Sequence, residues 1–406
     1  MIVFLLSLLL LFWNLGQNTL SNWDEALLAA VARDGGIWNG QRWWYEPPLV
    51  TWVLSLVTQL TYSEWWLRLP NAIASLILVM AVYRKGGLIA ALILLSTIEF
   101  LFRARQINVD IPLSLFLFLA ITRSSGFFVG LAAMTKRLSW LLAVPALIWA
   151  VRHKNWRREL GLFLLVALPW HIYSYFKFGR EFVDRYVIGF TLGKLTSVNA
   201  VTGDSPLFYV TALQHGIKLW FLVLPLALIW ALKQSKLKTW LIFIATYLVG
   251  LTLSPIKASW YMLPIYPVLA VLIGGFWGAV FKKRKTLGLI LAVGIFSFNL
   301  LKWRQEWLVP QTSLHQATLA KEVKSITKPN ETVYLDDDWL PVAVFYSQRQ
   351  VIPLRFNRGD RYVDKLNLPT GSLVLTNQET VENLTARVDK LETIKQVDNL
   401  LLTRVK

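Results

Sequence analysis

Two adjacent carboxylates, Asp24 and Glu25, follow the first apolar run of the chain and precede an apolar helical pattern. They would lie at the boundary between lipid and water, where a carboxylate can act as a base on a membrane-bound substrate. A structural interpretation is open as well. Asn22 with Glu25 has the spacing of a capping box, and Asp24 in the first turn is favoured by the helix dipole.

A third carboxylate, Asp110, opens a later apolar run, and Arg103 and Arg105 precede it. Guanidinium groups bind phosphate through paired hydrogen bonds, so this turn could hold a phosphate-bearing substrate. The alternatives are that Asp110 only starts a helix and that the arginines extend toward lipid headgroups. Lys257, in a short turn near Tyr261, is the first candidate for a phosphate ligand, because a lone cation beside an apolar turn is costly without a partner.

The elements that must position these residues are membrane helices. The chain has 406 residues, of which 55% are hydrophobic and 16% charged, against about 25% charged in soluble proteins. This excludes a single soluble domain, a disordered chain and a nucleic-acid-binding module. The net charge of +18 indicates basic loops beside anionic lipids. With no Cys and four scattered His, we expect no disulfide and no His or Cys metal cluster.

Apolar runs predict about eleven membrane crossings. They lie at 1–16, 67–83, 88–102, 111–122, 126–135, 138–151, 159–176, 212–232, 239–253, 260–281 and 286–301. With the N-terminus inside, the inner loops carry 14 Lys and Arg and the short outer turns carry 5, as the positive-inside rule favours. The odd number of crossings then places 17–66, 177–211 and the C-terminal region on the outer face.

The segment 17–66 is polar and aromatic, with Pro47–Pro48 at a helix start and tryptophans on either side. Tryptophans of this kind most simply form an interfacial belt. The pattern predicts two amphipathic helices that lie on the outer surface and floor a cavity.

The composition changes near residue 303, where short β-rich runs begin to alternate with helical patterns. The runs are Thr332–Leu335, Gln350–Leu354, Ser372–Thr376 and Asn399–Val405, and the helical patterns lie near 313–326, 339–347 and 379–390. We therefore expect a transmembrane domain over 1–302 and a small α/β domain over 303–406 outside the membrane.

Several motifs, in this order, resemble those of the glycosyltransferase C superfamily, and most of all the lipid A aminoarabinose transferases and the protein O-mannosyltransferases. They are Asp24-Glu25-Ala-x-x-Ala, Pro47-Pro48-Leu49-x-x-Trp52, Glu64-x-x-x-Arg68-Leu-Pro70, Arg103-Ala-Arg105-x-x-x-x-Asp110-Ile-Pro112-Leu113, Gly130-Leu-Ala-Ala-Met-Thr135-Lys136, Leu168-Pro169-Trp170 and Ser254-x-x-Lys257-x-x-x-Tyr261-x-Leu263-Pro264-x-Tyr266-Pro267. The resemblance covers about 1–270.

The resemblance implies a polytopic α-helical enzyme of a bacterial inner membrane. It would transfer a sugar from a polyprenyl-phosphate donor, with inversion, to a lipid, protein or glycan acceptor on the outer face. Asp24 would be the base, with Asp110 and Glu25 as its acidic partners. The residues expected around the donor are Lys257, Arg103, Arg105, Arg68, Lys136, Tyr261 and Glu46.

The chain departs from this family at Glu46, since family members usually have a Lys directly before Pro-Pro-Leu. Arg42, Arg68 or Lys136 would then have to meet the phosphate. Some members bind a divalent cation through an acid near this position and a distant His, which would be Glu46 and His215 here.

Two rival functions are a transporter and a non-catalytic protein that binds polyprenyl lipid. A transporter would place ionisable groups within its spans and show two similar halves. The acids here cluster in the expected outer loops and no internal repeat is visible, which disfavours the transporter.

Overall fold

The computed structural model describes residues 1–152, 155–192, 205, 207–304, 313–354, 368–385, 388 and 391–406. The chain forms two compact units. The first comprises 1–15, 44–50 and 68–310, and the second comprises 16–43, 51–67 and 311–406. Residues 16–43 and 51–67 thus cluster with the C-terminal region, and the domain boundary at 302/303 stays a prediction.

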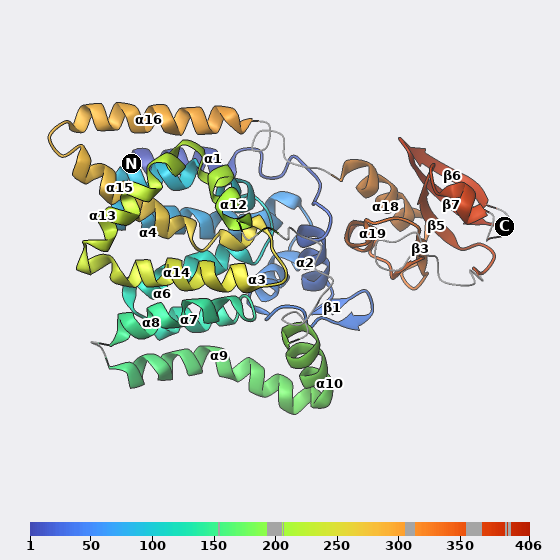
Figure 1. Cartoon of the computed structure of the whole chain (residues 1–406). Coiled ribbons are helices and arrows are strands. Elements are labelled where there is room, and N and C mark those ends of the chain that lie inside the picture. The colour runs from blue at the N-terminus through green and yellow to red at the C-terminus, as the bar shows by residue number, and fades with distance from the viewer. Residues whose placement is uncertain are drawn as a thin grey trace. The chain divides into compact units, whose positions relative to one another are not determined.

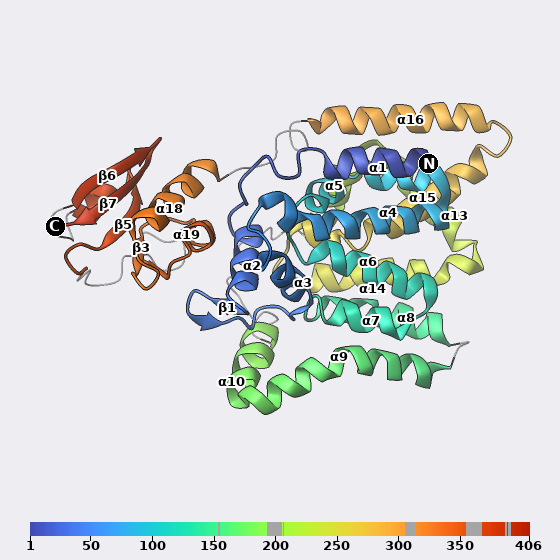
Figure 2. The same ribbon diagram turned by 180° about the vertical axis from the view of Figure 1, so that it is seen from behind.

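The first unit is a helical bundle in which α4, α6, α7, α8 and α14 run side by side, with α9 and α16 at its two edges (Figure 1). Its described elements are α1 (Ile2–Phe12), α4 (Glu64–Leu95, whose first turn belongs to the second unit), α5 (Ile98–Ala104), α6 (Asp110–Arg123), α7 (Gly126–Ala133), η1 (Ser139–Ala143), α8 (Val144–Val151), α9 (Trp156–Phe178), α10 (Arg180–Phe182), η2 (Val183–Leu192), α12 (Phe208–Ile217), η3 (Lys218–Leu222), α13 (Leu224–Leu232), η4 (Ser235–Leu237), α14 (Lys238–Leu253), η5 (Ser259–Met262), α15 (Tyr266–Val280) and α16 (Lys285–Lys302). From behind, α1 is seen beside α5 (Figure 2).

Every apolar run expected to cross the membrane contains a helix. The expected break between 67–83 and 88–102 corresponds to a kink in α4 at Gly87, whose φ of 77° and ψ of −170° are non-helical. A glycine adopts this conformation without the steric penalty that a side chain would add.

The number of crossings stays a prediction. Four helices of the described chain are long and apolar enough to cross a bilayer: Glu64–Leu95, Trp156–Phe178, Ser235–Leu253 and Lys285–Lys302. The pair Phe208–Leu222 and Leu224–Leu232, bent by 78°, adds a fifth if it is one span. Several other helices are short; α1, at 1.5 Å per residue, is roughly 16 Å long. With these spans the chain is an integral membrane protein.

Helix α7 packs closely against α9. A Cβ added at Gly126 would lie 1.7 Å from the Glu159 carbonyl oxygen, and one added at Gly130 would lie 2.6 Å from the Val166 Cβ. Small residues allow such close backbone approach between membrane helices. The Glu159 carboxylate also accepts a hydrogen bond from the Gly126 N–H (2.8 Å). The two helices are therefore locked together near the start of α7.

The second unit combines residues 16–43 and 51–67 with a sheet domain. Its described elements are α2 (Asp24–Arg33), β1 (Ile37–Trp38), β2 (Gln41–Arg42), most of α3 (Leu49–Thr58), α18 (Leu314–Ile326), β3 (Val333–Leu335), α19 (Leu340–Ser347), β4 (Val351–Pro353), β5 (Leu373–Asn377), α20 (Val381–Thr385), β6 (Leu391–Val397) and β7 (Leu400–Val405). The five-stranded sheet has the order β4-β3-β5-β7-β6. Strands β4, β3 and β5 are parallel, while β7 is antiparallel to both β5 and β6.

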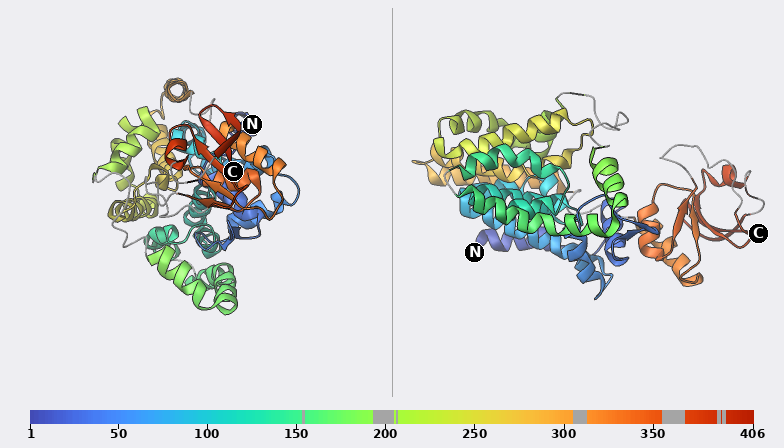
Figure 3. Two further views of the ribbon diagram at one scale, coloured as in Figure 1. Left: turned by 90° about the vertical axis from the view of Figure 1, so that its right-hand side faces the viewer. Right: turned by 90° about the horizontal axis from the view of Figure 1, so that it is seen from below.

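The expected strands and the helices near 313–326 and 339–347 are present, and α18 and α19 lie on one side of the sheet (Figure 3). Of the helical pattern near 379–390, α20 covers 381–385, and 386–387 and 389–390 lie outside the described residues. The β6 strand was not expected. It is an edge strand whose residues are mostly exposed and include Glu392 and Lys395. A strand with such a polar face lacks the apolar pattern from which strands are predicted. The segment 17–66 contains two helices, α2 and α3, as expected; their place on a membrane surface stays a prediction.

Candidate active site

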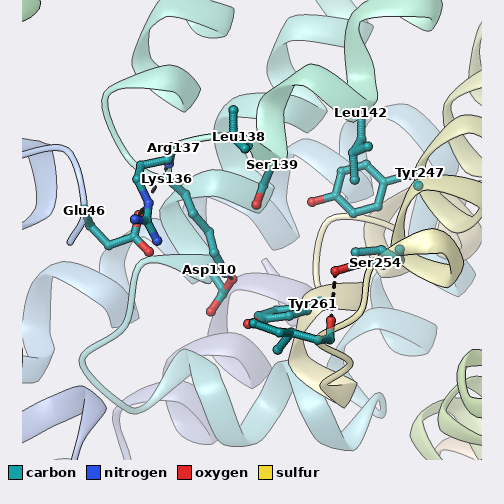
Figure 4. Close-up of a pocket in the computed structure, with 13 residues that line it drawn as sticks. Glu46, Asp110, Lys136, Arg137, Leu138, Ser139, Leu142, Tyr247, Ser254 and Tyr261 are labelled. Carbon is teal, nitrogen blue, oxygen red and sulfur yellow. Dashed lines mark hydrogen bonds and ion pairs between the residues drawn. The ribbon is translucent and has the colours of Figure 1, made fainter. Parts of the chain in front are cut away.

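One pocket of the first unit gathers acidic, basic and phenolic side chains (Figure 4). Its described lining residues are Glu46, Asp110, Lys136, Arg137, Leu138, Ser139, Leu142, Tyr247, Gly250, Leu251, Ser254, Ile256 and Tyr261. Four of these residues were expected in the site from the sequence: Glu46, Asp110, Lys136 and Tyr261. The pocket thus joins the turn after α7, the start of α6, the end of α14 and the loop before α15.

Asp110 and Lys136 form an ion pair in this pocket, with 2.5 Å between Asp110 Oδ1 and Lys136 Nζ. Asp110 does not cap its own helix: Asn108 does so, because its Oδ1 accepts hydrogen bonds from the Asp110 and Ile111 N–H groups (3.1 and 3.0 Å). The Asp110 carboxylate is therefore available to the pocket. The interpretation that Asp110 only starts a helix is wrong.

Lys136 lies in the turn after α7, outside the candidate spans. Its Nζ lies 4.5 Å from the ring centroid of Tyr261, a cation–π distance. Burial acts to lower the pKa of Lys136, but the negative charge of Asp110 above all, together with Tyr261 and Glu46, outweighs burial and raises this pKa. The ammonium is therefore charged at neutral pH inside a mostly apolar wall.

Glu46 and Arg137 support the turn that carries Lys136. Arg137 Nε lies 3.7 Å from Glu46 Oε2, which also accepts a hydrogen bond from the Arg137 backbone N–H (3.3 Å). The guanidinium stacks 4.5 Å above the ring of Tyr45. Burial, with the Glu46 charge second, raises the pKa of Tyr45 to about 12, so Tyr45 stays neutral. Glu46 thus has a cation as its observed partner.

Arg103 holds the loop before α15. Its guanidinium lies 4.4 Å above the Trp260 ring and 3.6 Å from Glu99 Oε1. The Ser259 hydroxyl donates to Glu99 Oε2 (3.2 Å). The loop carries Tyr261 and the half-buried Lys257; within the described lining of the pocket, Ile256 is present and Lys257 is not. Arg103 therefore shapes the pocket wall from outside the described lining.

Arg68 and Arg105 fix the chain directly after α1. Arg68 donates to the Leu15 carbonyl (2.9 Å) and Arg105 to the Trp13 carbonyl (2.5 Å). Burial, with the Arg68 charge second, lowers the pKa of Arg105 to about 10, so Arg105 stays charged at neutral pH. Neither arginine is part of the described lining.

Asp24 and Glu25 belong to the second unit, where they begin α2. The expected capping box of Asn22 and Glu25 is wrong. The N-cap residue is Trp23, which has a φ of 65° and makes no side-chain hydrogen bond to the helix. The buried Glu25 accepts a hydrogen bond from the Ser21 N–H (2.9 Å), while Asn22 donates to the Asp338 carbonyl (2.6 Å). Asp24 is an exposed residue. Its action beside Asp110 and Lys136 stays a prediction.

The residues do not fit the divalent cation that the resemblance suggested. Glu46 is engaged by Arg137, and the His215 ring packs against Trp303 with 4.4 Å between centroids. The described part of the chain holds no group of three or more His, Asp or Glu that could hold a metal ion.

Sequence reasoning missed Arg137, Tyr247 and Ser139 as lining residues. Arg137 had a signal, since it adjoins Lys136 in a basic interruption of an apolar run. Tyr247 lies within the apolar run 239–253, and Ser139 is the second residue of the apolar run 138–151. Their positions in the pocket depend on how α14 packs beside η1 and α8, which the local sequence does not encode.

Comparison with known proteins adds three findings. Residues 45–173 match the family model described as dolichyl-phosphate-mannose-protein mannosyltransferase. An uncharacterized protein of Aquifex aeolicus is 24% identical in an alignment of 328 residues that covers 70% of this chain and 65% of that protein. The chain therefore aligns with slightly less than two thirds of the length of this curated relative.

The crystal structure of ArnT from Cupriavidus metallidurans bound to undecaprenyl phosphate is similar throughout. It has a TM-score of 0.78 at 16% identity, with 99% of this chain and 97% of that chain covered. The apo state of the same protein gives a TM-score of 0.77 at 15% identity, with the same coverage. The chain therefore has the fold of ArnT, and together with the mannosyltransferase family match this confirms its resemblance to the glycosyltransferase C superfamily.

Proposed function

We propose that the chain is a membrane glycosyltransferase that moves a sugar from a polyprenyl-phosphate donor to an acceptor on the outer face of a bacterial inner membrane. The observation that carries this proposal is the buried Asp110–Lys136 pair in a pocket that also holds Tyr261. It is supported by the similar ArnT fold, whose crystal contains undecaprenyl phosphate, and by the family match.

In this proposal Lys136 binds the carrier phosphate. A phosphate leaving group needs positive charge more than it needs a general acid, and Lys136 keeps its charge. Family members usually have a Lys directly before Pro-Pro-Leu, where this chain has Glu46. In this proposal Lys136 provides the positive charge of that missing Lys. Lys257, from the loop that carries Tyr261, is the second proposed ligand. We assign Arg103, Arg105 and Arg68 to holding the loops around the site.

The proposed reaction is a single in-line displacement. The acceptor oxygen attacks the anomeric carbon while the bond from that carbon to the phosphate oxygen breaks, and the phosphate leaves with the electron pair. Attack opposite the leaving group inverts the anomeric centre. Asp24 accepts the acceptor's proton, and the buried Glu25 holds the turn that carries Asp24. Asp110 orients the sugar or acceptor through Oδ2, because Oδ1 is held by Lys136. A single displacement needs only one base, whereas glycosidases use two carboxylates.

The test is sugar transfer by the full-length protein in bacterial membrane vesicles supplied with sugar-loaded undecaprenyl phosphate. We expect transfer by the parent, its loss in Asp24→Asn, and no change in Glu382→Gln, an exposed acid of α20. Full activity of Asp24→Asn would remove Asp24 from the mechanism. A parent that binds undecaprenyl phosphate but transfers no sugar would support the rival, a lipid-binding protein.

A further inference from the structure

The turn before Asp24 is hydrogen-bonded to the C-terminal sheet domain, and both belong to the second unit. The Leu20 N–H donates to the Tyr346 hydroxyl (2.8 Å), and this hydroxyl donates to Glu64 Oε1 (2.9 Å). Asn22 donates to the Asp338 carbonyl (2.6 Å). The Tyr346 hydroxyl therefore bridges the start of the turn to the first residue of α4.

The same unit also holds α2 at its far end. Arg33, the last residue of α2, donates to the carbonyls of Val344 and Phe345 (3.2 and 2.7 Å). These carbonyls lie in the last turn of α19, where intrahelical donors are few, and the Val344 carbonyl also accepts from the Gln348 N–H (3.1 Å). The helix that begins with Asp24 is thus tied to α19 at its end and to the sheet domain at the turn before it.

The β1–β2 hairpin adds another attachment. Asn39 in its turn donates to the Val351 carbonyl (2.6 Å) and accepts from the Val351 N–H (2.9 Å). Val351 lies on the edge strand β4, so the Asn39 side chain replaces the partner strand that an edge lacks.

The backbone at Trp23 indicates what these attachments do. Trp23 has a φ of 65° and a ψ of −99°, which is a strained region for a residue with a side chain. Such a conformation persists only where the surroundings fix it. The residue that follows is Asp24, so the strained turn sets the direction in which the Asp24 carboxylate leaves the backbone.

We propose that the C-terminal α/β domain is a working part of the transferase and that Tyr346 is the positioning residue through which it orients Asp24. The inference rests on the proposed function. Tyr346 suits the role because it is 6% exposed and its hydroxyl meets both Leu20 and Glu64. Its ring also lies 4.9 Å from Lys321 Nζ, which Phe would retain. Tyr346→Phe therefore removes two hydrogen bonds and keeps the ring in place.

The test compares Tyr346→Phe with Tyr334→Phe in the full-length protein. Tyr334 lies on β3 of the same domain and packs against a small core around Val374. We expect Tyr346→Phe to lower kcat at least about tenfold, since a displaced catalytic group costs rate, with the KM for the donor unchanged. Tyr334→Phe should match the parent. Glu64→Gln keeps an acceptor for the Tyr346 hydroxyl and should retain activity, whereas Glu64→Ala should resemble Tyr346→Phe.

Hydrogen exchange of the substrate-free protein gives a second readout. The Leu20 amide should exchange faster in Tyr346→Phe and not in Tyr334→Phe. If the parent transfers sugar and Tyr346→Phe keeps both its kcat and its Leu20 protection, this inference is overturned while the proposed function stands. If the parent and Tyr334→Phe transfer no sugar to any acceptor, the proposed function fails and this inference fails with it.

Discussion

Replacement of Lys136 by Met removes the ammonium that we propose binds the carrier phosphate and keeps much of the stem's apolar volume. In the substrate-free protein the change leaves the Asp110 carboxylate, 5% exposed, without its partner at 2.5 Å. Breaking a buried pair on one side costs about 3–5 kcal/mol. Because this pair lines a pocket, we expect a loss of stability at the lower end of this range, which would be measured as a lower unfolding temperature.

The effect on the donor has a separate magnitude. A hydrogen bond to a charged group contributes about 1.5–3 kcal/mol, so the Kd for undecaprenyl phosphate should rise roughly 10- to 150-fold. The assay is titration of the lipid into protein held in nanodiscs, monitored by tryptophan fluorescence, with thermal unfolding measured on the same samples.

The double variant Lys136→Met/Asp110→Asn separates the two roles. It removes both charges, so the thermal stability should recover, while the phosphate still lacks its cation and the Kd should remain high. Recovery of lipid affinity together with stability would mean that Lys136 serves only as the counter-ion of Asp110, and the reasoning would be refuted.

Other expected outcomes concern pH, packing and the second cation. Because folding raises the pKa of Lys136, the stabilisation that its charge provides is complete below about pH 10 and is lost only as the pH rises through the higher pKa of the folded protein. The difference between the unfolding midpoints of the parent and Lys136→Met that is due to Lys136 should therefore stay constant from pH 7 to pH 10. Gly126→Ala should destabilise the protein in thermal unfolding, because its Cβ would lie 1.7 Å from the Glu159 carbonyl, whereas Gly161→Ala meets nothing within 4 Å and should be neutral; equal unfolding temperatures would contradict the packing argument. Lys257→Met should raise the undecaprenyl phosphate Kd less than Lys136→Met, since Lys257 is half-buried and better screened; a larger rise would make Lys257 the main phosphate ligand.

The helices and most strands could be predicted because their signals are local. Each apolar run gave a helix, and the kink at Gly87 falls near a predicted boundary. The parallel strands β3 and β5 are buried and apolar, so their sequences indicate strands. The edge strand β6 is polar and was missed for that reason.

The candidate site could be predicted only as a set of residue types. Lys136 and Lys257 both lie in short turns beside apolar runs, and local sequence ranked Lys257 first. In the fold Lys136 pairs with Asp110, while Asn108 caps α6. Such partners come from segments far apart in the chain, so the direction of each side chain depends on tertiary packing.

The most direct measurement follows the carrier lipid through one turnover. Purified protein in vesicles receives undecaprenyl phosphates loaded with a labelled pentose or hexose, together with an extract of envelope lipids and proteins. We predict that undecaprenyl phosphate is released in equal amount to the sugar transferred, and that Asp24→Asn and Lys136→Met reduce both while Glu382→Gln changes neither. Failure of the parent to release carrier with any of these sugars and acceptors would contradict the assignment as a transferase.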